Sequence, residues 1–352
     1  MQIVFLIRPY AISMYSFDNN TYTLLGTQKF SHILDEPNDD YENRVVFVCK
    51  DISQDFIKTD IFKNNHKNIK DIKVILTNPW SIYEIINLEK DFEKDQTIDQ
   101  RMIEKMIVHK QHDNLSLVKN DVFNISLNGY SVKSLNNQKA RFLHLQYLSI
   151  FSSTNFLNKL QNTLETIFHL HNIKIDSIYS YVNELNRDNK ESNELRIIIE
   201  DQSIDLIYVH GGRTVSTLFI PCGCVNVKTN IKEALHIDDI MLDKILKSKS
   251  LNVNKLEKSL DNIWPDLNSE VQEKINTQIN LNLEFMKIQI RNFVDSIDME
   301  NIVKDVKINI YTLDEDAYYT LGLILADNFK NDVYMMSKLL TNELNIFTKK
   351  IF

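Results

Sequence analysis

The sequence predicts an α/β protein of two lobes, with a smaller segment inserted into the first lobe. Strand and helix patterns alternate along most of the chain. A chain of 352 residues that is 43% hydrophobic is too long for one small core. The order strand, hairpin, strand and helix that opens the chain also returns after residue 196. Together these observations favour two similar lobes.

Composition excludes several classes of protein. The net charge of -8 is spread along the chain without a basic stripe, so we expect no nucleic-acid partner. Three cysteines, Cys49, Cys222 and Cys224, are too few for a disulfide framework. The opening residues MQIVFLIRPY lack a basic flank and a cleavage site, and no run reaches the roughly 20 apolar residues of a membrane span. We therefore expect a cytoplasmic protein.

The first lobe opens with a predicted meander. Residues 2–7, 10–17 and 21–29 are expected to form three consecutive strands. A helix follows, with an apolar face formed by Val45, Val48, Ile52 and Phe56. A second helix over 153–171, capped near Ser153 or Thr154, precedes a strand at 173–182.

The inserted segment, about 72–151, has its own order of elements. A strand is predicted at 72–80, and a short helix follows, with Thr97 as N-cap and Gln100 completing a capping box. Asn128-Gly129 indicates a hairpin turn, and residues 140–151 are the expected partner strand. The predicted order is strand, helix, strand, strand.

The second half opens with the stretch IIIEDQSIDLIYV at 197–209, followed by HGGR. It predicts a hairpin that carries Glu200 and Asp201 at its turn. A third strand ends in IPCGC, and a helix is predicted from about Thr229 to Leu235. Helical periodicity then continues to about 296, broken at Trp264-Pro265, before a strand from 306.

This order resembles the bacterial actin-like family of the cell-division protein FtsA and the pilus-assembly protein PilM. The resemblance implies a two-lobed actin-like ATPase (ribonuclease H-like) fold with an SHS2-like insertion. It also implies the following division of the chain. The first lobe takes 1–71 and 152–195, the SHS2-like subdomain 72–151, the second lobe 196–235 and 306–332, a helical subdomain 236–305, and a tail 333–352.

The resemblance assigns vestigial nucleotide-binding positions in the second lobe. Glu200 falls at the aspartate of the family's second phosphate loop, and Asp205 at its second aspartate. Gly211 and Gly212 fall at the turn, and Gly223 in the motif that opens the next helix. Carboxylates at the ends of strands are also commonly solvated or capping residues, and that alternative stays open.

The departures from the family pattern affect all three nucleotide elements. Leu6 and Arg8 replace the aspartate and glycine of the first phosphate loop, so a magnesium-bound water loses its carboxylate anchor. Cys224 replaces a glycine, and TLDEDAYY places three carboxylates, Asp314, Glu315 and Asp316, where the nucleotide would lie. The whole chain has only 6 glycines for phosphate-cradling loops. We expect no catalytic residue, no metal and no cofactor, with ATP and magnesium bound only if these loops still function.

Two classes of function follow. The first is an FtsA-like adapter that recruits protein partners, such as a tubulin-like division protein, at the inner face of the membrane, with self-association possible. A PilM-like adapter that binds pilus components is the alternative within this class. The second class is a working ATPase of the same fold.

The tail adds a membrane hypothesis. In NELNIFTKKIF, the residues Leu344, Phe347 and Ile351 share one helical face, and Leu340 extends it. Lys349 and Lys350 lie beside that face, within reach of anionic headgroups. The alternative is a last helix packed on the second lobe.

Overall fold

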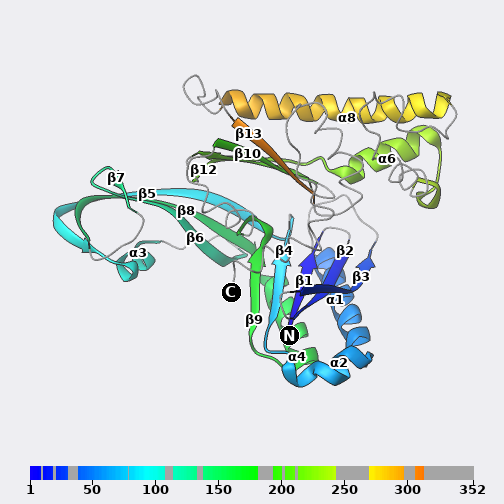
Figure 1. The fold of residues 1–352 in the computed structure, drawn as a ribbon, viewed down its shortest axis with the longest axis horizontal. Coiled ribbons are helices and arrows are strands. Elements are labelled where there is room, and N and C mark those ends of the chain that lie inside the picture. The colour runs from blue at the N-terminus through cyan, green and yellow to red at the C-terminus, as the bar shows by residue number, and fades with distance from the viewer. Residues whose placement is uncertain are drawn as a thin grey trace. The chain divides into compact units, whose positions relative to one another are not determined.

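A computed structural model describes most of the chain. The described residues are 1–8, 11–18, 21–30, 39–77, 79–107, 114–132, 138–180, 193–199, 203–210, 213–242, 269–296 and 306–312. The chain divides into two compact units, Met1–Leu185 and Asn186–Phe352 (Figure 1). Each unit is described by itself.

The first unit is built on a five-stranded sheet of order β3-β2-β1-β4-β9. Strands β1 (Gln2–Ile7), β2 (Ala11–Asp18) and β3 (Thr21–Lys29) form antiparallel pairs, which confirms the predicted meander. Strands β4 (Ile72–Leu76) and β9 (Ile173–Ser177) extend the sheet in parallel. Both are shorter than predicted, since Thr77 opens a turn and a helical turn follows Ser177.

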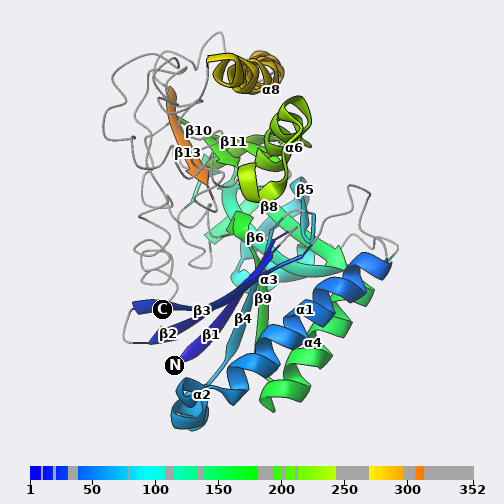
Figure 2. The same ribbon diagram turned by 90° about the vertical axis from the view of Figure 1, so that its right-hand side faces the viewer.

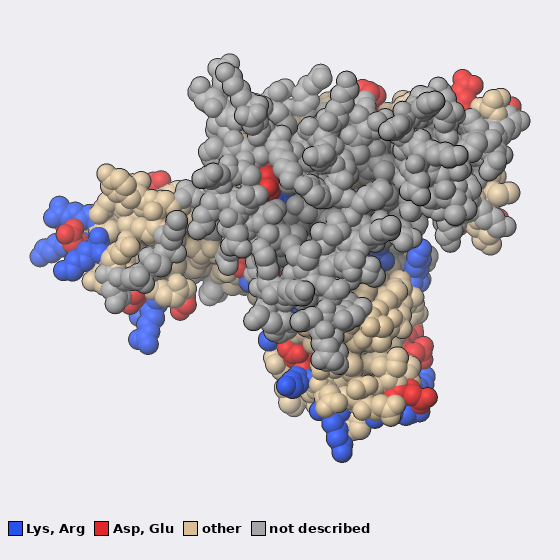
Figure 3. All heavy atoms as spheres, viewed as in Figure 1, with Lys and Arg blue, Asp and Glu red and all other residues tan. Residues whose placement is uncertain are grey.

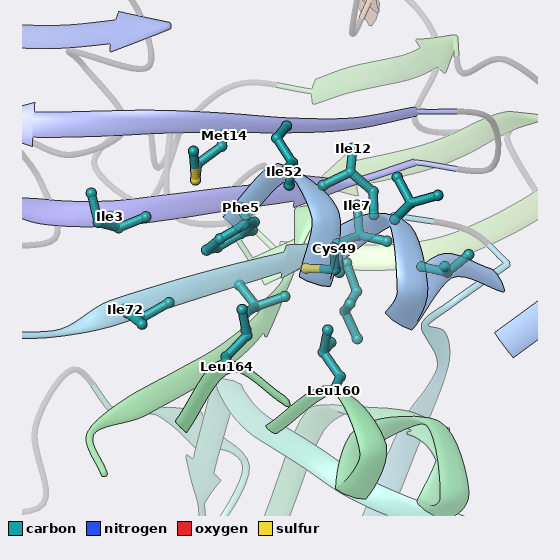
Figure 4. Close-up of a cluster of buried hydrophobic side chains, with 14 of the residues drawn as sticks. Ile3, Phe5, Ile7, Ile12, Met14, Cys49, Ile52, Ile72, Leu160 and Leu164 are labelled. Carbon is teal, nitrogen blue, oxygen red and sulfur yellow. The ribbon is translucent and has the colours of Figure 1, made fainter. Parts of the chain in front are cut away.

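Two helices lie side by side over one face of this sheet, α1 (Asp39–Lys58) and α4 (Thr154–Phe168) (Figure 2). Ser153 caps α4 by accepting a hydrogen bond from Phe156 N, as its sequence predicts. Figure 4 shows how the apolar side chains of both helices meet those of the strands. Members of this core include Ile3, Phe5, Ile7, Ile12, Met14, Cys49, Ile52, Ile72, Leu160 and Leu164. The short helix α2 (Asp60–Asn65) and the 3-10 turn His66–Asn68 lead from α1 to β4.

The inserted segment begins later than predicted. β4 pairs with β1, so it belongs to the main sheet, and the insertion starts at β5 (Ile82–Ile98). This long strand was missed because its second half, LEKDFEKDQ, is charged and mostly exposed. It pairs with β8 (Gln138–Ser153) in a sheet of order β5-β8-β6-β7, where β6 is Leu115–Leu127 and β7 is Tyr130–Ser131.

Local signals in the insertion are confirmed in part. Asn128 and Gly129 both have positive φ, at 51° and 85°, as a two-residue hairpin turn requires. Asn128 Oδ1 also accepts hydrogen bonds from Arg141 N and Phe142 N, which ties the turn to β8. The helix α3 (Gln100–Met106) is present, but Asp99 is its N-cap and Thr97 lies within β5, which ends at Ile98. The prediction of Thr97 as the cap was therefore wrong.

The four described strands of the second unit, β12-β11-β10-β13, repeat the order of β3-β2-β1-β4 in the first. Strands β10 (Asn193–Ile199), β11 (Ile204–His210) and β12 (Arg213–Ile220) are antiparallel, and β13 (Val306–Thr312) runs parallel to β10. β10 begins in this unit, so its first residues do not belong to the first lobe as predicted.

Two helices cover one face of this second sheet, α6 (Cys224–Leu235) and α8 (Ser269–Ser296). α6 starts five residues before the predicted Thr229, at the second cysteine of Cys-Gly-Cys. Leu242 and the buried residues of α8 pack in the same core as β10 and β11. The described part of 236–305 therefore shares the core of the lobe and does not form a separate helical core.

Candidate functional site

The end of β1 is where the resemblance places the first phosphate loop. Leu6 is 5% exposed and its strand pairs fully with β2 and β4, so an apolar side chain occupies the position of the family carboxylate. The backbone N–H of Arg8 donates to the carbonyl of Ala11 at 2.9 Å, which closes the hairpin. That N–H is therefore already used inside the protein and is not directed at a ligand.

The carbonyl groups at this strand end are held by the residues that follow β4. Ile7 O accepts hydrogen bonds from both Thr77 N and Thr77 Oγ1 at 3.1 Å. Trp80 Nε1 donates to Arg8 O at 3.2 Å. The Trp80 ring stacks on Phe156 with centroids 4.9 Å apart. These hydrogen bonds and the ring stacking connect the main sheet, α4 and the start of the insertion at the first loop.

The second candidate loop lies at one end of the strands of the second sheet. Ile199 is paired with Ile204, and Ile204 with Ile220. The β10–β11 connection and the C-terminal end of β12 are therefore at the same end of the sheet. Gly223, the N-cap of α6, follows three residues after Ile220. The structure therefore places Asp205 and Gly223 near the same end of the second sheet.

The residues at this end of the sheet are more buried and more fully hydrogen-bonded than those of an open phosphate site would be. Asp205 is 0% exposed and faces Ile198 and Phe219 in the strand register. Gly223 N donates to the side chain of Asn226 at 2.8 Å, so the helix start is capped from within. A carboxylate sealed in the sheet and an N–H already bonded leave little for a nucleotide to contact at these two residues.

A buried ion pair lies on the same strand as this hairpin. Glu194 Oε2 and Arg196 Nε are 3.2 Å apart, with side chains 2% and 3% exposed. Both point to the sheet face opposite the α6 and α8 core, because they alternate with Leu195 and Ile197, which face that core. Sequence reasoning missed this pair because charged residues in an apolar strand carry no motif.

The remaining predicted site residues lie outside the described part of the chain. These are Glu200, Gly211, Gly212, Asp314, Glu315 and Asp316, and the tail residues Leu340, Leu344, Phe347, Lys349, Lys350 and Ile351. Where residues are described, no group of three or more His, Cys, Asp and Glu side chains is placed to hold a metal ion. The helices of that same part include none long and apolar enough to cross a membrane.

The three cysteines are free thiols buried in the two cores. Burial raises the pKa of Cys49 in the first unit and the pKa of Cys222 in the second. Cys222 Sγ lies 4.0 Å from Asn282 Oδ1 of α8, which also accepts from Asn230 Nδ2 at 3.3 Å. Thiols held protonated in this way have a packing role and are poor nucleophiles.

A groove runs along the outer side of β5 in the insertion. It has a volume of about 780 Å³ and is lined by six consecutive strand residues and one residue of β8: Glu84, Ile85, Ile86, Asn87, Leu88, Glu89 and Tyr147. Burial raises the pKa of the Tyr147 hydroxyl, which is consistent with its position beneath the strand. This groove was not predicted from the sequence, since β5 itself was not predicted.

Charge is distributed unevenly over the surface of the described residues. Figure 3 shows Lys and Arg side chains gathered at the free end of the inserted sheet, while both signs are interspersed over the first lobe. The chain as a whole remains acidic at -8. Among the described residues visible in Figure 3, no extended basic stripe for a duplex is seen.

Comparisons with solved structures agree with this architecture. A chain of a PilM-PilN type IV pilus biogenesis complex is similar over 100% of this chain and 98% of its own length, with a TM-score of 0.65 and 9% identity. The fold is that of the actin-like ATPases. The ethanolamine utilization protein EutJ from Carboxydothermus hydrogenoformans is similar over 98% of this chain and 88% of its own, with a TM-score of 0.50 and 9% identity.

A Bacteroides thetaiotaomicron protein described as having an actin-like ATPase fold and unknown function matches 67% of this chain and 74% of its own, at a TM-score of 0.37 and 10% identity. No family model and no curated protein matches the sequence. At identities this low, likeness establishes the actin-like fold and leaves activity and partners to be argued from the residues.

Proposed function

We propose that this protein is a PilM-like adapter of the actin-like fold, which binds protein partners of a pilus-type assembly and does not depend on ATP. The observation that carries the proposal is the similarity to the PilM chain, which runs over nearly the whole of both chains. That similarity includes the inserted segment, so a partner-binding relative matches the full set of elements.

The chemistry of the candidate loops supports nucleotide independence. Leu6 stands where the family has a carboxylate, and the Arg8 and Gly223 N–H groups already donate to Ala11 and Asn226. A phosphate would have to break those hydrogen bonds, and each costs about 1 kcal/mol to lose, before it gained any of its own. Adapter function fits these residues better than an ATPase cycle does.

The inserted sheet is the proposed docking module, equivalent to the SHS2-like subdomain of the resembled family. Its order β5, α3, β6, β8 repeats strand, helix, strand, strand, with β7 as a short addition to the hairpin. It has its own core around Ile103, Leu143 and Leu145, so it holds its shape independently of a partner. Association with the inner face of the membrane, through the partner or the tail, belongs to the same proposal.

Affinity purification from the source cells tests this function. Tagged full chain is recovered with and without ATP and magnesium, and co-purifying proteins are identified by mass spectrometry. We expect components of a pilus-type assembly in equal yield under both conditions. Recovery of a tubulin-like division protein instead would favour the FtsA-like role, and recovery that requires ATP would favour a working ATPase.

Calorimetry supplies the second half of the test. We expect no heat of ATP binding at millimolar magnesium for the native chain. Micromolar affinity that disappears in Glu200→Ala would contradict nucleotide independence, because Glu200 is the residue that the resemblance assigns to the second phosphate loop.

A further inference from the structure

The outer edge of β5 has the position and length of a strand-pairing site. Among the described strands, β5 is the last on its side of the inserted sheet, with β8 as its neighbour. The groove of about 780 Å³ follows this edge from Glu84 to Glu89. An edge strand presents backbone N–H and C=O groups with which another strand can pair. The groove therefore suits an extended strand as its occupant.

A second copy of this chain can pair with this edge in only a few registers. Two identical antiparallel strands in one sheet are related by a two-fold axis perpendicular to that sheet. The residue on the axis faces its own copy, and residues equally far to either side of it face one another. The registers to compare are therefore those with Ile86, Asn87 or Leu88, the middle of the groove, on the axis.

With Asn87 on the axis, the facing side chains match. Ile86 faces Leu88 of the other copy, on the side of the sheet that packs against the insertion core. Lys90 faces Glu84 on this same side. Asn87, which is exposed, faces its own copy on the other side, where two amides can exchange hydrogen bonds. Because Glu84 takes part in a further interaction of its own chain, the choice of register rests on the apolar pair and on Asn87.

The two neighbouring registers match less well. With Ile86 on the axis, the exposed Lys90 would face Ile82 of the other copy. With Leu88 on the axis, Lys90 would face Ile86. Each arrangement places an ammonium group opposite an aliphatic side chain, where it has no favourable cross-strand contact. The strand sequence therefore favours the register centred on Asn87.

The inserted sheet limits such pairing to two copies. The regular pairing of β5 with β8 ends after Asp91, where the register shifts. On the opposite side of the sheet, the last described strand is β7, which has only two residues, Tyr130–Ser131. A two-fold pair uses the β5 edge of both copies, so no long edge remains among the described strands of this sheet for a third copy.

We infer that two copies of this protein pair through their β5 edges as antiparallel strands, with Asn87 on the two-fold axis, so that one sheet continues across both copies. The inference goes beyond the proposed function and does not depend on it. A single pair of strands is a small interface, so we expect a dissociation constant in the micromolar range. The protein would then exchange between monomer and dimer as its concentration changes.

Analytical ultracentrifugation of the full chain over a range of concentrations tests the pairing. We expect a monomer–dimer equilibrium for the native chain. Asn87→Asp alone, or Asn87→Lys alone, should weaken the dimer about fivefold, because each places like charges opposite one another on the axis. An equimolar mixture of the two variants should recover the native strength within about twofold, because opposite charges then meet there.

Matched controls use an exposed amide of the same strand outside the groove. Gln96→Glu and Gln96→Lys make comparable changes of charge at such a position. Each should leave the dimer within about twofold of native. Recovery in the mixture of Asn87 variants also shows that both variants are folded.

Cross-linking tests the register directly. Residues directly opposite in an antiparallel pair have Cα atoms about 4.5–5.5 Å apart, within the range of a disulfide. Asn87→Cys should therefore form a disulfide-linked dimer on copper-catalysed air oxidation, while the native cysteines are buried. Glu89→Cys would face Ile85 of the other copy, and should cross-link about tenfold less.

Several results would overturn the pairing. A native chain that stays monomeric at its highest soluble concentration would exclude the dimer, and oligomers that keep growing would exclude a closed pair. A dimer that neither Asn87 variant weakens would place the interface elsewhere, and a mixture that stays weak would exclude this register. A monomeric native chain whose Asn87→Asp variant loses an assembly partner in affinity purification would assign the edge to that partner.

Discussion

The β1–β2 hairpin of the first lobe and the β10–β11 hairpin of the second occupy equivalent places in sheets of the same order. In the first, the end of β1 is apolar at Leu6 and is held by Thr77 and Trp80. In the second, β10 and β11 bury charged residues, Glu194, Arg196 and Asp205. One topology therefore supports a strand end formed by Leu6 and the buried Arg8 in one lobe and a buried ion pair with Asp205 nearby on the next strand in the other.

This difference shows that strand order and loop chemistry are separable. The order follows from apolar strands and right-handed connections, and it tolerates replacement of the residues that would face a nucleotide. Similarity of fold to actin-like ATPases consequently says little about ATP, and the side chains at the two hairpins decide the question. In each lobe, substitutions of the residues around the hairpin test which contacts stabilise it.

Trp80→Ala should have the largest effect, on the first lobe. It removes the stacking on Phe156 and the hydrogen bond to Arg8 O from a side chain that is 3% exposed. We expect a loss of about 4 kcal/mol in the free energy of unfolding, measured in urea. Tyr130→Ala, at a position 78% exposed, is the control and should cost less than about 0.5 kcal/mol. A loss under about 1 kcal/mol for Trp80→Ala would show that the loop is held by other contacts.

Arg196→Met should have the next largest effect, on the second lobe. It leaves Glu194 buried without its ion-pair partner at 3.2 Å, which costs about 3 kcal/mol. Replacing both residues, as Glu194→Leu with Arg196→Met, should restore much of that loss because no buried charge remains. Thermal unfolding of the single and double variants measures this. Additive losses would mean that the two side chains do not act as a pair.

The helix caps provide a smaller comparison between the lobes. Ser153→Ala removes the oxygen that accepts from Phe156 N at the start of α4, and Asn226→Ala removes the acceptor for Gly223 N at the start of α6. Each should cost about 1 kcal/mol of stability. If Asn226→Ala instead confers measurable ATP binding, the second helix start is a nucleotide site closed only by its own side chain.

At neutral pH the ionisation of buried thiols should have the smallest effect on stability, and this effect grows only as the pH rises. Unfolded cysteine titrates near pH 8.5, while burial raises the pKa of Cys49 and Cys222 in the folded protein. Above about pH 8.5 the folded state therefore binds more protons than the unfolded state, and stability falls as pH rises. Cys49→Ala should make that fall shallower by up to about 1.4 kcal/mol per pH unit. Denaturation curves at pH 8 and pH 10 that shift equally in both proteins would show that this thiol contributes nothing.

Much of the fold was predicted where local signals and apolar periodicity agree. The three opening strands, the buried face of α1, the cap of α4 at Ser153 and the turn at Asn128-Gly129 were all expected from sequence and are confirmed. Predictions went wrong where two signals compete over a few residues. Thr97 has the residue type of a cap, but β5 continues through it, and Asp99 takes the role.

For the candidate site, too, some residues were predicted from the sequence, while their contacts were seen only in the structure. The resemblance predicted from the sequence that Asp205 and Gly223 match nucleotide positions of the family pattern and that Leu6 departs from it, and these assignments stay predictions. Their surroundings could not be predicted, since Trp80 reaches Arg8 across 72 residues of chain and Asn226 turns back on Gly223. Hydrogen bonds of this kind depend on where the elements pack and leave no periodic trace in sequence.

By itself, the sequence determined an α/β chain with two repeated units and one inserted segment, because apolar spacing and turn residues are local properties. Only the tertiary structure decided that β4 joins the main sheet, that Glu194 and Arg196 are buried together, and that a groove runs along β5. The physical reason is that burial and strand pairing arise between residues far apart in the chain. The same glutamate or isoleucine can lie in a core, an ion pair or an open edge according to what the fold places beside it.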